Sequence, residues 1–148
     1  MQMTQICECE CNILKSIIMS LEKVIYAQES YKLTGIFFKV HNELGCYCKE
    51  SQYSNALEKL FVENSIPYKK ELCIKSDSEL IKDNSNRIDF LVYDKIVIEI
   101  KAIKFAGREE YNQVQRYLKA MNLKLGLLIN FHQRYLKPKR IINSNAKE

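Results

Sequence analysis

The amino-acid sequence predicts an α/β (α+β) domain in which helices flank a mixed β-sheet. Two observations lead to this fold class. Helical apolar spacing fills the first part of the chain, and short strand patterns then surround one further helix, so the order from the third helix onward is α-β-β-β-α-β with one more β. In addition, 148 residues with 47% hydrophobic and 28% charged side chains are enough to bury one core.

Three amphipathic helices are predicted before the first strand. Apolar residues recur at helical spacing in three segments, residues 12–27, 30–44 and 50–64. Gly45 stops the second of these helices. The chain is therefore divided into an N-terminal helical extension (1–28), a folded domain (29–143) and a polar tail (144–148).

The strands follow the third helix. Pro67 opens a strand at residues 68–75, and the polar segment 76–86 has no apolar period and is predicted to be a surface loop. The later elements are two short strands around Asp89 and Glu99, a helix at 108–121, a strand at 124–131 and a last strand at 139–143. The Leu-Gly-Leu-Leu-Ile-Asn run in the strand at 124–131 is apolar without alternation, which indicates burial on both faces.

The hairpin between Asp89 and Lys101 carries charged groups that an ordinary strand would not hold. Strand side chains alternate between the two faces of a sheet, so Glu99 and Lys101 share one face. A carboxylate two residues before a lysine, with a second carboxylate on the neighbouring strand, can hold a divalent metal beside a cation. Phosphodiester hydrolysis needs that arrangement, because the metal activates water and offsets charge on the phosphate. The alternative is a half-buried strand whose Glu99 and Lys101 are simply solvated.

The length of the hairpin connection decides whether the two carboxylates can meet. A two-residue turn would pair Asp89 with Ile100, on the face opposite Glu99. A three-residue connection, 93–95, would pair Asp89 directly with Glu99 on the same face. A working site therefore requires the odd-length turn, a bulge, or a bend near Asp89.

Positive charge is concentrated in the carboxyl-terminal third. Residues 101–148 hold 11 Lys and Arg against 3 acidic residues, whereas residues 1–100 hold 12 against 15. This bias favours a polyanionic partner, because phosphate contacts supply much of nucleic-acid affinity; simple solvation of lysines is the alternative. No apolar run reaches the ~18–20 residues of a membrane span, and no secretory signal pattern is present, so we expect a cytoplasmic protein without a membrane partner.

The chain has six cysteines, of which five stand in C-x-C spacing: Cys7, Cys9, Cys11, Cys46 and Cys48. This spacing differs from the C-x2-C knuckle of a zinc site, and disulfide scaffolds belong to small secreted domains, so reduced thiols are expected. The sixth, Cys73, is expected to fill the core face of its strand. His41 and His132 have no metal-ligand spacing and are interpreted as structural or surface residues.

Five sequence segments, taken in order, carry a resemblance to a known family. They are FKVHNELG (38–45), ESQY with the following Ala-Leu (50–57), RIDFLV (87–92), VIEIKA (97–102) and YLKAMNLKLGLLINF (117–131). In them the chain resembles the PD-(D/E)xK nuclease superfamily, with its restriction-endonuclease-like fold, and more closely the small bacterial family named after its GxxExxY motif. The likeness covers about residues 31–143. Tyr47 stands where the motif has glycine, so the sequence does not decide whether a tight turn precedes the third helix. Glu50 and Tyr53 match the motif.

The resemblance implies a metal site. Asp89 and Glu99 would ligate one Mg2+ or Mn2+, with the backbone carbonyl of Ile100 as a further oxygen ligand, since such hard cations take carboxylate, carbonyl and water oxygens. Lys101 would orient the attacking water or stabilise the charged transition state. Glu50 would hold a metal-bound water; its alternative is an acid that interacts with the dipole at a helix N-terminus. Some relatives of this fold carry iron–sulfur clusters, which is the alternative to reduced thiols.

The resemblance also implies nucleic-acid contacts. Members of the RecB-like branch carry Gln-x3-Tyr on the helix after the Glu-x-Lys strand, and Gln113 and Tyr117 match this pattern. Four residues apart, both can face the site, although Tyr117 could equally belong to the core. Arg116 and Lys119 of the same helix are expected to contact phosphates, together with Arg108 and residues 137–140.

Two function classes follow from these patterns. The first is a metal-dependent nuclease that hydrolyses phosphodiester bonds, with DNA as the expected substrate. The alternative is a non-catalytic nucleic-acid- or protein-binding module that keeps the fold and works with a partner or as a homodimer. The complete set of Asp89, Glu99 and Lys101 favours the first class, since a decayed site would usually lose one of these charges.

Overall fold

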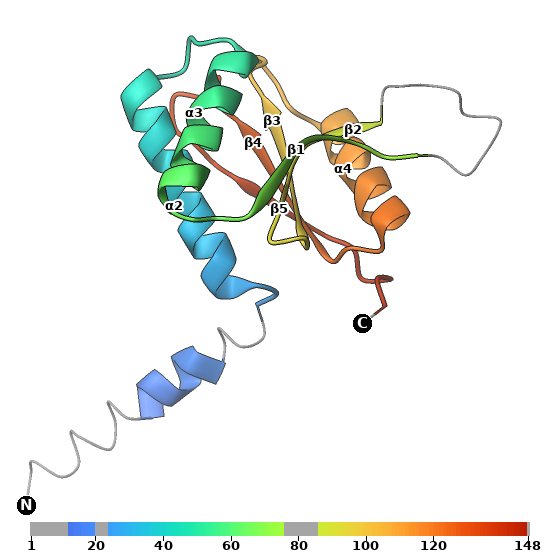
Figure 1. Ribbon diagram of the computed structural model, residues 1–148. Coiled ribbons are helices and arrows are strands. Elements are labelled where there is room, and N and C mark those ends of the chain that lie inside the picture. Colours follow the sequence, from blue (N-terminus) through green and yellow to red (C-terminus); the bar gives the residue numbers. More distant parts are fainter. Residues whose placement is uncertain (1–11, 20–23, 76–85, 148) are drawn as a thin grey trace, which may run out of the picture. The chain divides into compact units, whose positions relative to one another are not determined.

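The computed structural model describes residues 12–19, 24–75 and 86–147 (Figure 1). The chain divides into two compact units, Met1–Lys32 and Leu33–Glu148. No helix in the described ranges is both long enough and apolar enough to cross a membrane. Cys7, Cys9 and Cys11 of the predicted C-x-C segment, and residues 76–85 of the predicted surface loop, lie outside the described residues.

The first unit differs from the prediction of one helix at residues 12–27. Residues 12–19 are helical, but residues 24–26 form a bend and a turn, and α2 (Ala27–Leu44) begins three residues before the expected start. Tyr26 has a left-handed φ of 51°, which a continuous right-handed helix does not allow. The apolar side chains of the helical stretch are about half exposed, namely Ile13, Leu14, Ile17 and Ile18.

A five-stranded sheet forms the centre of the second unit (Figure 1). Its strands lie in sequence order: β1 (Tyr68–Cys73), β2 (Arg87–Val92), β3 (Ile96–Lys101), β4 (Leu125–Asn130) and β5 (Lys139–Ile142). β3 and β4 are parallel, whereas the other neighbours are antiparallel. The helix α4 (Arg108–Met121) connects the parallel pair, as a crossover connection requires. The predicted fold class is confirmed.

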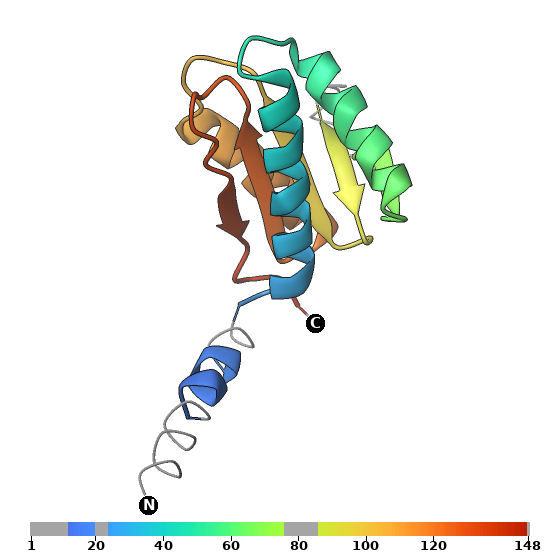
Figure 2. The same ribbon diagram turned by 90° about the vertical axis from the view of Figure 1, so that its left-hand side faces the viewer.

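Helices cover both faces of this sheet (Figure 2). On one face lies α3 (Glu50–Glu63), where Phe61 packs edge-on against Phe90 of β2, with ring centroids 5.2 Å apart. On the other face α4 contributes Val114, Tyr117 and Leu118 to a buried cluster with strand residues of β2, β3, β4 and β5. The site described below lies at the end of β3, between these two layers.

Cys73 corrects one expectation about β1. It was expected to fill the core, but its side chain is exposed. β1 is an edge strand with strictly alternating burial, and Leu72 takes the inward position next to it. Cys46, Cys48 and Cys73 form no disulfide in the described structure, and their reduced state stays a prediction.

Burial on both faces is confirmed for β4, whose six residues are all buried. Gly126 allows this, because α4 approaches the strand closely there. A Cβ atom added at Gly126 would lie 2.4 Å from Cγ1 of Val114 and 3.5 Å from Cδ1 of Leu118. Val114 is β-branched and fully buried, so it has little freedom to move aside.

We therefore expect Gly126→Ala to lower the free energy of unfolding by about 1–3 kcal/mol, the usual cost of overpacking a core. The matched control is Gly35→Ala in α2, where an added Cβ meets no heavy atom within 4 Å. That substitution should raise the free energy of unfolding by about 0.5–1 kcal/mol, because alanine is the better helix former. Urea titration of both variants measures the difference, and equal effects would contradict this account of β4.

Candidate active site

The connection between β2 and β3 has three residues. Val92 pairs with Ile96 across the hairpin, which leaves residues 93–95 as the connection, and the pairing continues to Phe90 opposite Ile98. Two connection residues, at positions 93 and 94, have left-handed φ angles of 55° and 54°. This is the odd-length turn that a shared face for the two carboxylates requires.

Asp89 lies where the ladder between β2 and β3 stops. No pairing with β3 is recorded beyond Phe90, and the Asp89 side chain takes its place: Ile100 N–H donates a hydrogen bond of 2.7 Å to Asp89 Oδ2. The carboxylate is thereby held directly beside the backbone of β3, one residue from Glu99.

Glu99 and Lys101 form a close ion pair on β3. Lys101 Nζ lies 3.1 Å from Glu99 Oε1, and the two side chains are 19% and 3% exposed. Within the described part of the chain, the second carboxylate oxygen, Glu99 Oε2, is buried and has no hydrogen-bond partner. A buried oxygen of this kind is costly in the folded protein, so a bound cation at this place would stabilise it.

Glu50 approaches from the first turn of α3 and is set by the loop before that helix. Tyr53 holds this loop, because its hydroxyl donates to Gly45 O at 2.6 Å and accepts from Cys48 N–H at 3.2 Å. The Tyr53 ring is fully buried and stacks on Phe131, with centroids 4.4 Å apart and an interplanar angle of 9°. Tyr53 therefore fixes the chain direction into Glu50.

The tight turn before α3 is made at Gly45 and not at Tyr47. Gly45 has a φ of 71° and donates its N–H to His41 O at 2.8 Å, which ends α2. Tyr47 is not among the residues with a left-handed φ. Replacement of a glycine by tyrosine at position 47 is therefore compatible with this turn.

The chain was compared with known proteins. The sequence model described as the PD-(D/E)XK nuclease superfamily matches residues 27–142, which is most of the chain and includes Asp89, Glu99 and Lys101. The chain belongs to this superfamily. No curated protein and no solved structure gives a significant match. The finer assignment to the GxxExxY family stays a prediction.

The acidic groups of this PD-(D/E)XK protein repel one another. Burial and then the Asp89 charge raise the pKa of Glu99 to about 8, and burial chiefly raises the pKa of Asp89 above its ordinary value. Burial and the Asp89 charge also raise the pKa of Glu50. For Lys101, burial lowers the pKa, but the charges of Glu99, Glu50 and Asp89 outweigh it and raise the pKa. With all three carboxylates ionised beside Lys101, the site would have an excess of negative charge, and a divalent cation would offset it.

These shifts make the stability of the metal-free protein depend on pH. Glu99 has a pKa of about 8 when folded and an ordinary value of 4.5, so between these values the folded state binds a proton that the unfolded chain lacks. Rising pH therefore favours unfolding. The raised pKa values of Asp89 and Glu50 act in the same direction. We expect the urea midpoint to be lower at about pH 8 than at about pH 5.5.

The control for this prediction is Glu99→Gln, which removes the titrating group and should reduce the difference between the two midpoints. Glu58 and Glu110 have lowered pKa values and stay ionised throughout this pH range, so they do not oppose the trend. A midpoint that rises with pH in the wild-type protein would show that Glu99 is ionised in the folded state.

On α4, Tyr117 lies in the core and Gln113 lies beside it. Tyr117 is 1% exposed, and its hydroxyl accepts from Gln113 Nε2 at 2.7 Å and donates to Arg87 O at 3.1 Å. Burial, and then the Glu99 charge, raise the pKa of Tyr117, so its hydroxyl interacts electrostatically with the site. Arg116 and Lys119 are exposed on the same helix.

An open pocket of about 190 Å³ adjoins Asp89 on the side of β1. It is lined by residues of α3, β1, β2 and β3: Glu50, Ser51, Ser54, Asn55, Lys70, Glu71, Arg87, Asp89 and Ile100. The sequence predicted three of these as site residues, namely Glu50, Asp89 and Ile100, and not the other six, among them the charged Lys70, Glu71 and Arg87. Glu71 has a left-handed φ of 53°, a break in the strand geometry that accompanies the approach of both Lys70 and Glu71 to this pocket.

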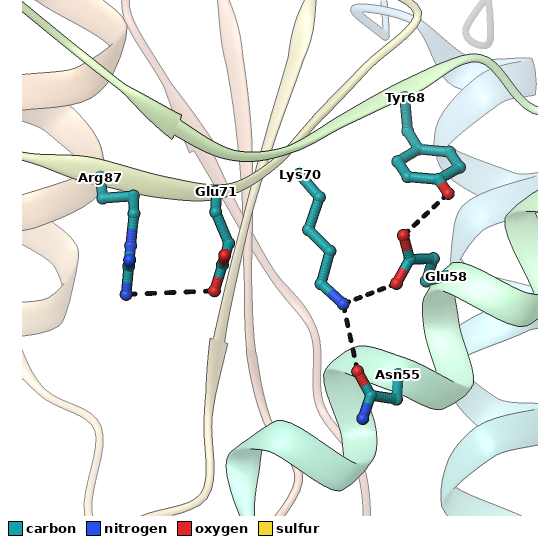
Figure 3. Close-up of polar contacts among 6 residues, drawn as sticks. All are labelled: Asn55, Glu58, Tyr68, Lys70, Glu71 and Arg87. Carbon is teal, nitrogen blue, oxygen red and sulfur yellow. Dashed lines mark hydrogen bonds and ion pairs between the residues drawn. The ribbon is translucent and has the colours of Figure 1, made fainter.

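On the β1 and β2 side of the pocket, Lys70, Glu71 and Arg87 form ion pairs (Figure 3). Lys70 Nζ lies 2.6 Å from Glu58 Oε2 and donates to Asn55 Oδ1 at 3.1 Å. Arg87 and Glu71 form a longer ion pair of 4.0 Å across β1 and β2. The sequence shows a lysine and a glutamate side by side in a short strand, and this pattern is too common to predict that Lys70 and Glu71 line a pocket.

The residues at the end of β3 suit a magnesium or manganese ion. Asp89 and Glu99 would supply carboxylate oxygens, Glu99 Oε2 has no partner in the described structure, and the N–H of Ile100 on β3 holds the Asp89 carboxylate. Among the described residues no three His, Cys, Asp or Glu side chains are gathered as a ready-made cage. Mg2+ is usually held by one or two carboxylates and keeps several waters, so a two-carboxylate set fits it.

Proposed function

We propose that this protein is a nuclease that uses Mg2+ or Mn2+ to hydrolyse phosphodiester bonds of DNA. The observation that carries the proposal is the buried, unpartnered Glu99 Oε2 next to Asp89 and Lys101, within a chain of the PD-(D/E)XK nuclease superfamily. A buried carboxylate oxygen without a hydrogen-bond partner destabilises the folded protein, and coordination of a cation by that oxygen would offset this loss of stability.

In this proposal Asp89 and Glu99 would hold the ion through their carboxylates, with the carbonyl of Ile100 as a further protein ligand. The ion supplies Lewis-acid activation of water and offsets charge on the phosphate. The Ile100 N–H keeps the Asp89 carboxylate in place through its 2.7 Å hydrogen bond. The buried position of Glu99 excludes water from one side of the site and strengthens its interaction with a cation.

Lys101 acts on the reacting groups rather than on the ion. Its Nζ is already 3.1 Å from Glu99 Oε1 and half-buried, so it is held in one region without a substrate. From there it would orient the attacking water and stabilise charge that develops on the phosphate. Glu50, more exposed at the first turn of α3, would hold a metal-bound water through its carboxylate.

Nucleic acid would lie along α4 and the loops at the end of the sheet. Arg116 and Lys119 are exposed on α4 and would contact phosphates, and Gln113 would set the orientation of the Tyr117 hydroxyl toward the site. Arg108 at the start of α4 adds a further cation. Reduced thiols, as the cysteine spacing predicts, would suit the cytoplasm as the place of action.

The test is a cleavage assay on the full chain with labelled single-stranded and duplex DNA. We expect products with Mg2+ or Mn2+ and none with a chelator or with Asp89→Asn. Binding of the same DNA without cleavage by the metal-loaded wild type would reject the nuclease and favour the non-catalytic binding module.

A further inference from the structure

Three loops meet at the end of the sheet where the parallel strands β3 and β4 finish: residues 45–49, 102–107 and 131–138. They lie together in both views (Figures 1 and 2). Hydrogen bonds tie the second loop to the strands on either side of the third: Ile103 N–H donates to Asn130 Oδ1 at 3.1 Å, and Lys139 Nζ donates to Ala106 O at 3.3 Å. A bond of 2.7 Å between His41 Nε2 and Gln133 O ties the end of α2 to the third loop.

Each loop exposes one aromatic side chain. Tyr47 is 90% exposed, Phe105 is 80% exposed and Tyr135 is 71% exposed. The other aromatic residue in these loops, Phe131, is fully buried against Tyr53, so the loops do have core positions for rings. Three large rings left in water at one end of a small domain need a reason, since exposure of apolar surface is unfavourable.

Cations accompany the rings. Lys104 Nζ lies 5.7 Å from the Phe105 ring centroid, and Arg134 Cζ lies 5.5 Å from the Tyr135 ring centroid. The His132 ring meets Tyr47 edge-on at 6.4 Å. The three loops contain no acidic residue, whereas they hold four Lys and Arg residues: Lys49, Lys104, Arg134 and Lys137. The surface is therefore aromatic and positively charged.

This combination suits unpaired nucleic-acid bases. A base offers its flat face only when it is not stacked inside a duplex, and proteins bind such bases by stacking aromatic rings on them beside cations that contact the phosphates. A duplex would present its phosphates to the same cations but would leave the three rings without partners. An acidic protein partner would pair with the lysine and arginine side chains, but it would not explain why each loop exposes an aromatic side chain.

We propose that Tyr47, Phe105 and Tyr135 form a stacking surface for unpaired bases, so that the ligand of this end of the domain is single-stranded nucleic acid. The surface adjoins the proposed active site along the chain: Lys101 precedes the second loop, and Glu50 follows the first. The binding of single strands is independent of catalysis. Its role as substrate selection rests on the proposed nuclease function.

The test measures binding without cleavage. Fluorescence anisotropy of labelled oligothymidine of about 20 nucleotides, with a chelator present, is compared for the wild type and for Tyr47→Leu, Phe105→Leu and Tyr135→Leu. Each leucine removes a ring but keeps apolar bulk, and stacking losses predict roughly 5- to 100-fold weaker binding. Tyr47→Phe and Tyr135→Phe keep the ring and should restore the affinity that the leucines lose.

Two controls make this outcome specific. Tyr31→Leu removes a tyrosine that is 84% exposed but lies outside the three loops, and it should leave oligothymidine binding unchanged. The affinity for a blunt duplex of the same length should be the same for the leucine variants and for the wild type. An oligouridine arm shows whether the surface distinguishes DNA from RNA, and binding of either strand through the rings supports the proposal.

Leucine variants that bind oligothymidine as tightly as the wild type would overturn the stacking surface, as would equal losses on single strands and duplex. These results leave the nuclease proposal standing if metal-dependent cleavage is present. Conversely, ring-dependent binding by a protein that cleaves nothing would reject the nuclease and keep the surface. The two proposals therefore fail separately.

Discussion

Lys101→Ala is expected to slow DNA cleavage by ~10²–10³ at saturating metal, because it removes a preorganised positive charge from the transition state. The lysine is held 3.1 Å from Glu99 Oε1 in the free protein, so little rearrangement is needed before it acts. Metal binding should remain, since the carboxylates hold the ion. Single-turnover cleavage rates with excess enzyme measure the chemical step without product release.

The control for Lys101→Ala is Lys104→Ala, a change of the same residue type three positions further on, at an exposed position beside Phe105. It belongs to the proposed single-strand surface, so its effect should appear in the affinity for single strands rather than in the rate at saturation. If Lys101→Ala cleaved as fast as the wild type, the activity would come from another site or another protein.

Glu99→Ala is expected to abolish both metal binding and cleavage. It removes the carboxylate whose Oε2 is buried without a partner and whose pKa is raised to about 8. At about pH 8 the metal-free variant should lose this unfavourable charge, which offsets part of the cost of the cavity that the smaller side chain leaves. The isosteric Glu99→Gln avoids the cavity and should be more stable than the wild type at that pH.

Cleavage rates and urea midpoints are therefore measured on the same preparations. The account expects activity to disappear while the stability of Glu99→Gln rises at about pH 8. A Glu99→Gln protein that is less stable than the metal-free wild type at this pH would contradict the placement of excess negative charge at the site. A Glu99→Gln protein that still cleaves DNA would remove Glu99 from the proposed ligands.

Much of the fold could be predicted because it depends on local patterns. The unbroken apolar run of β4 predicted burial on both faces, and the central position of that strand explains it. The face shared by Glu99 and Lys101 followed from strand alternation alone, and the observed ion pair agrees with it. A shared face for Asp89 and Glu99 required an odd-length connection, a bulge, or a bend near Asp89, and the sequence could not choose among these three solutions.

The remainder depends on backbone conformations and long-range contacts that local patterns do not encode. The bend and turn at residues 24–26, with a left-handed φ at Tyr26, interrupt the single helix that apolar spacing indicated for residues 12–27. Cys73 is exposed because β1 is an edge strand, which only the strand order reveals. Lys70 and Glu71 are adjacent in β1 and both line the pocket, although neighbouring side chains of a regular strand point to opposite faces. The left-handed φ of Glu71 breaks the regular strand geometry there.

The sequence allowed two positions for Tyr117, one facing the site and one in the core. Its spacing from Gln113 allowed it to face the site, and its apolar ring allowed it to lie in the core. The structure buries the ring, while the hydroxyl is bonded to Gln113 and Arg87 O. A tyrosine has an apolar body and a polar tip, so sequence spacing alone could not separate these two positions.

Asp89 and Glu99 are proposed to hold a divalent ion, and calorimetric titration of Mn2+ into the metal-free protein at about pH 8 measures this binding without a cleavage assay. The matched variants are Asp89→Ala and Asp94→Ala; the second removes an exposed carboxylate on the hairpin connection, paired with Lys69 at 2.7 Å. We expect one binding event in the wild type and in Asp94→Ala, and its loss in Asp89→Ala. Equal binding by all three proteins, or no binding by the wild type, would contradict it.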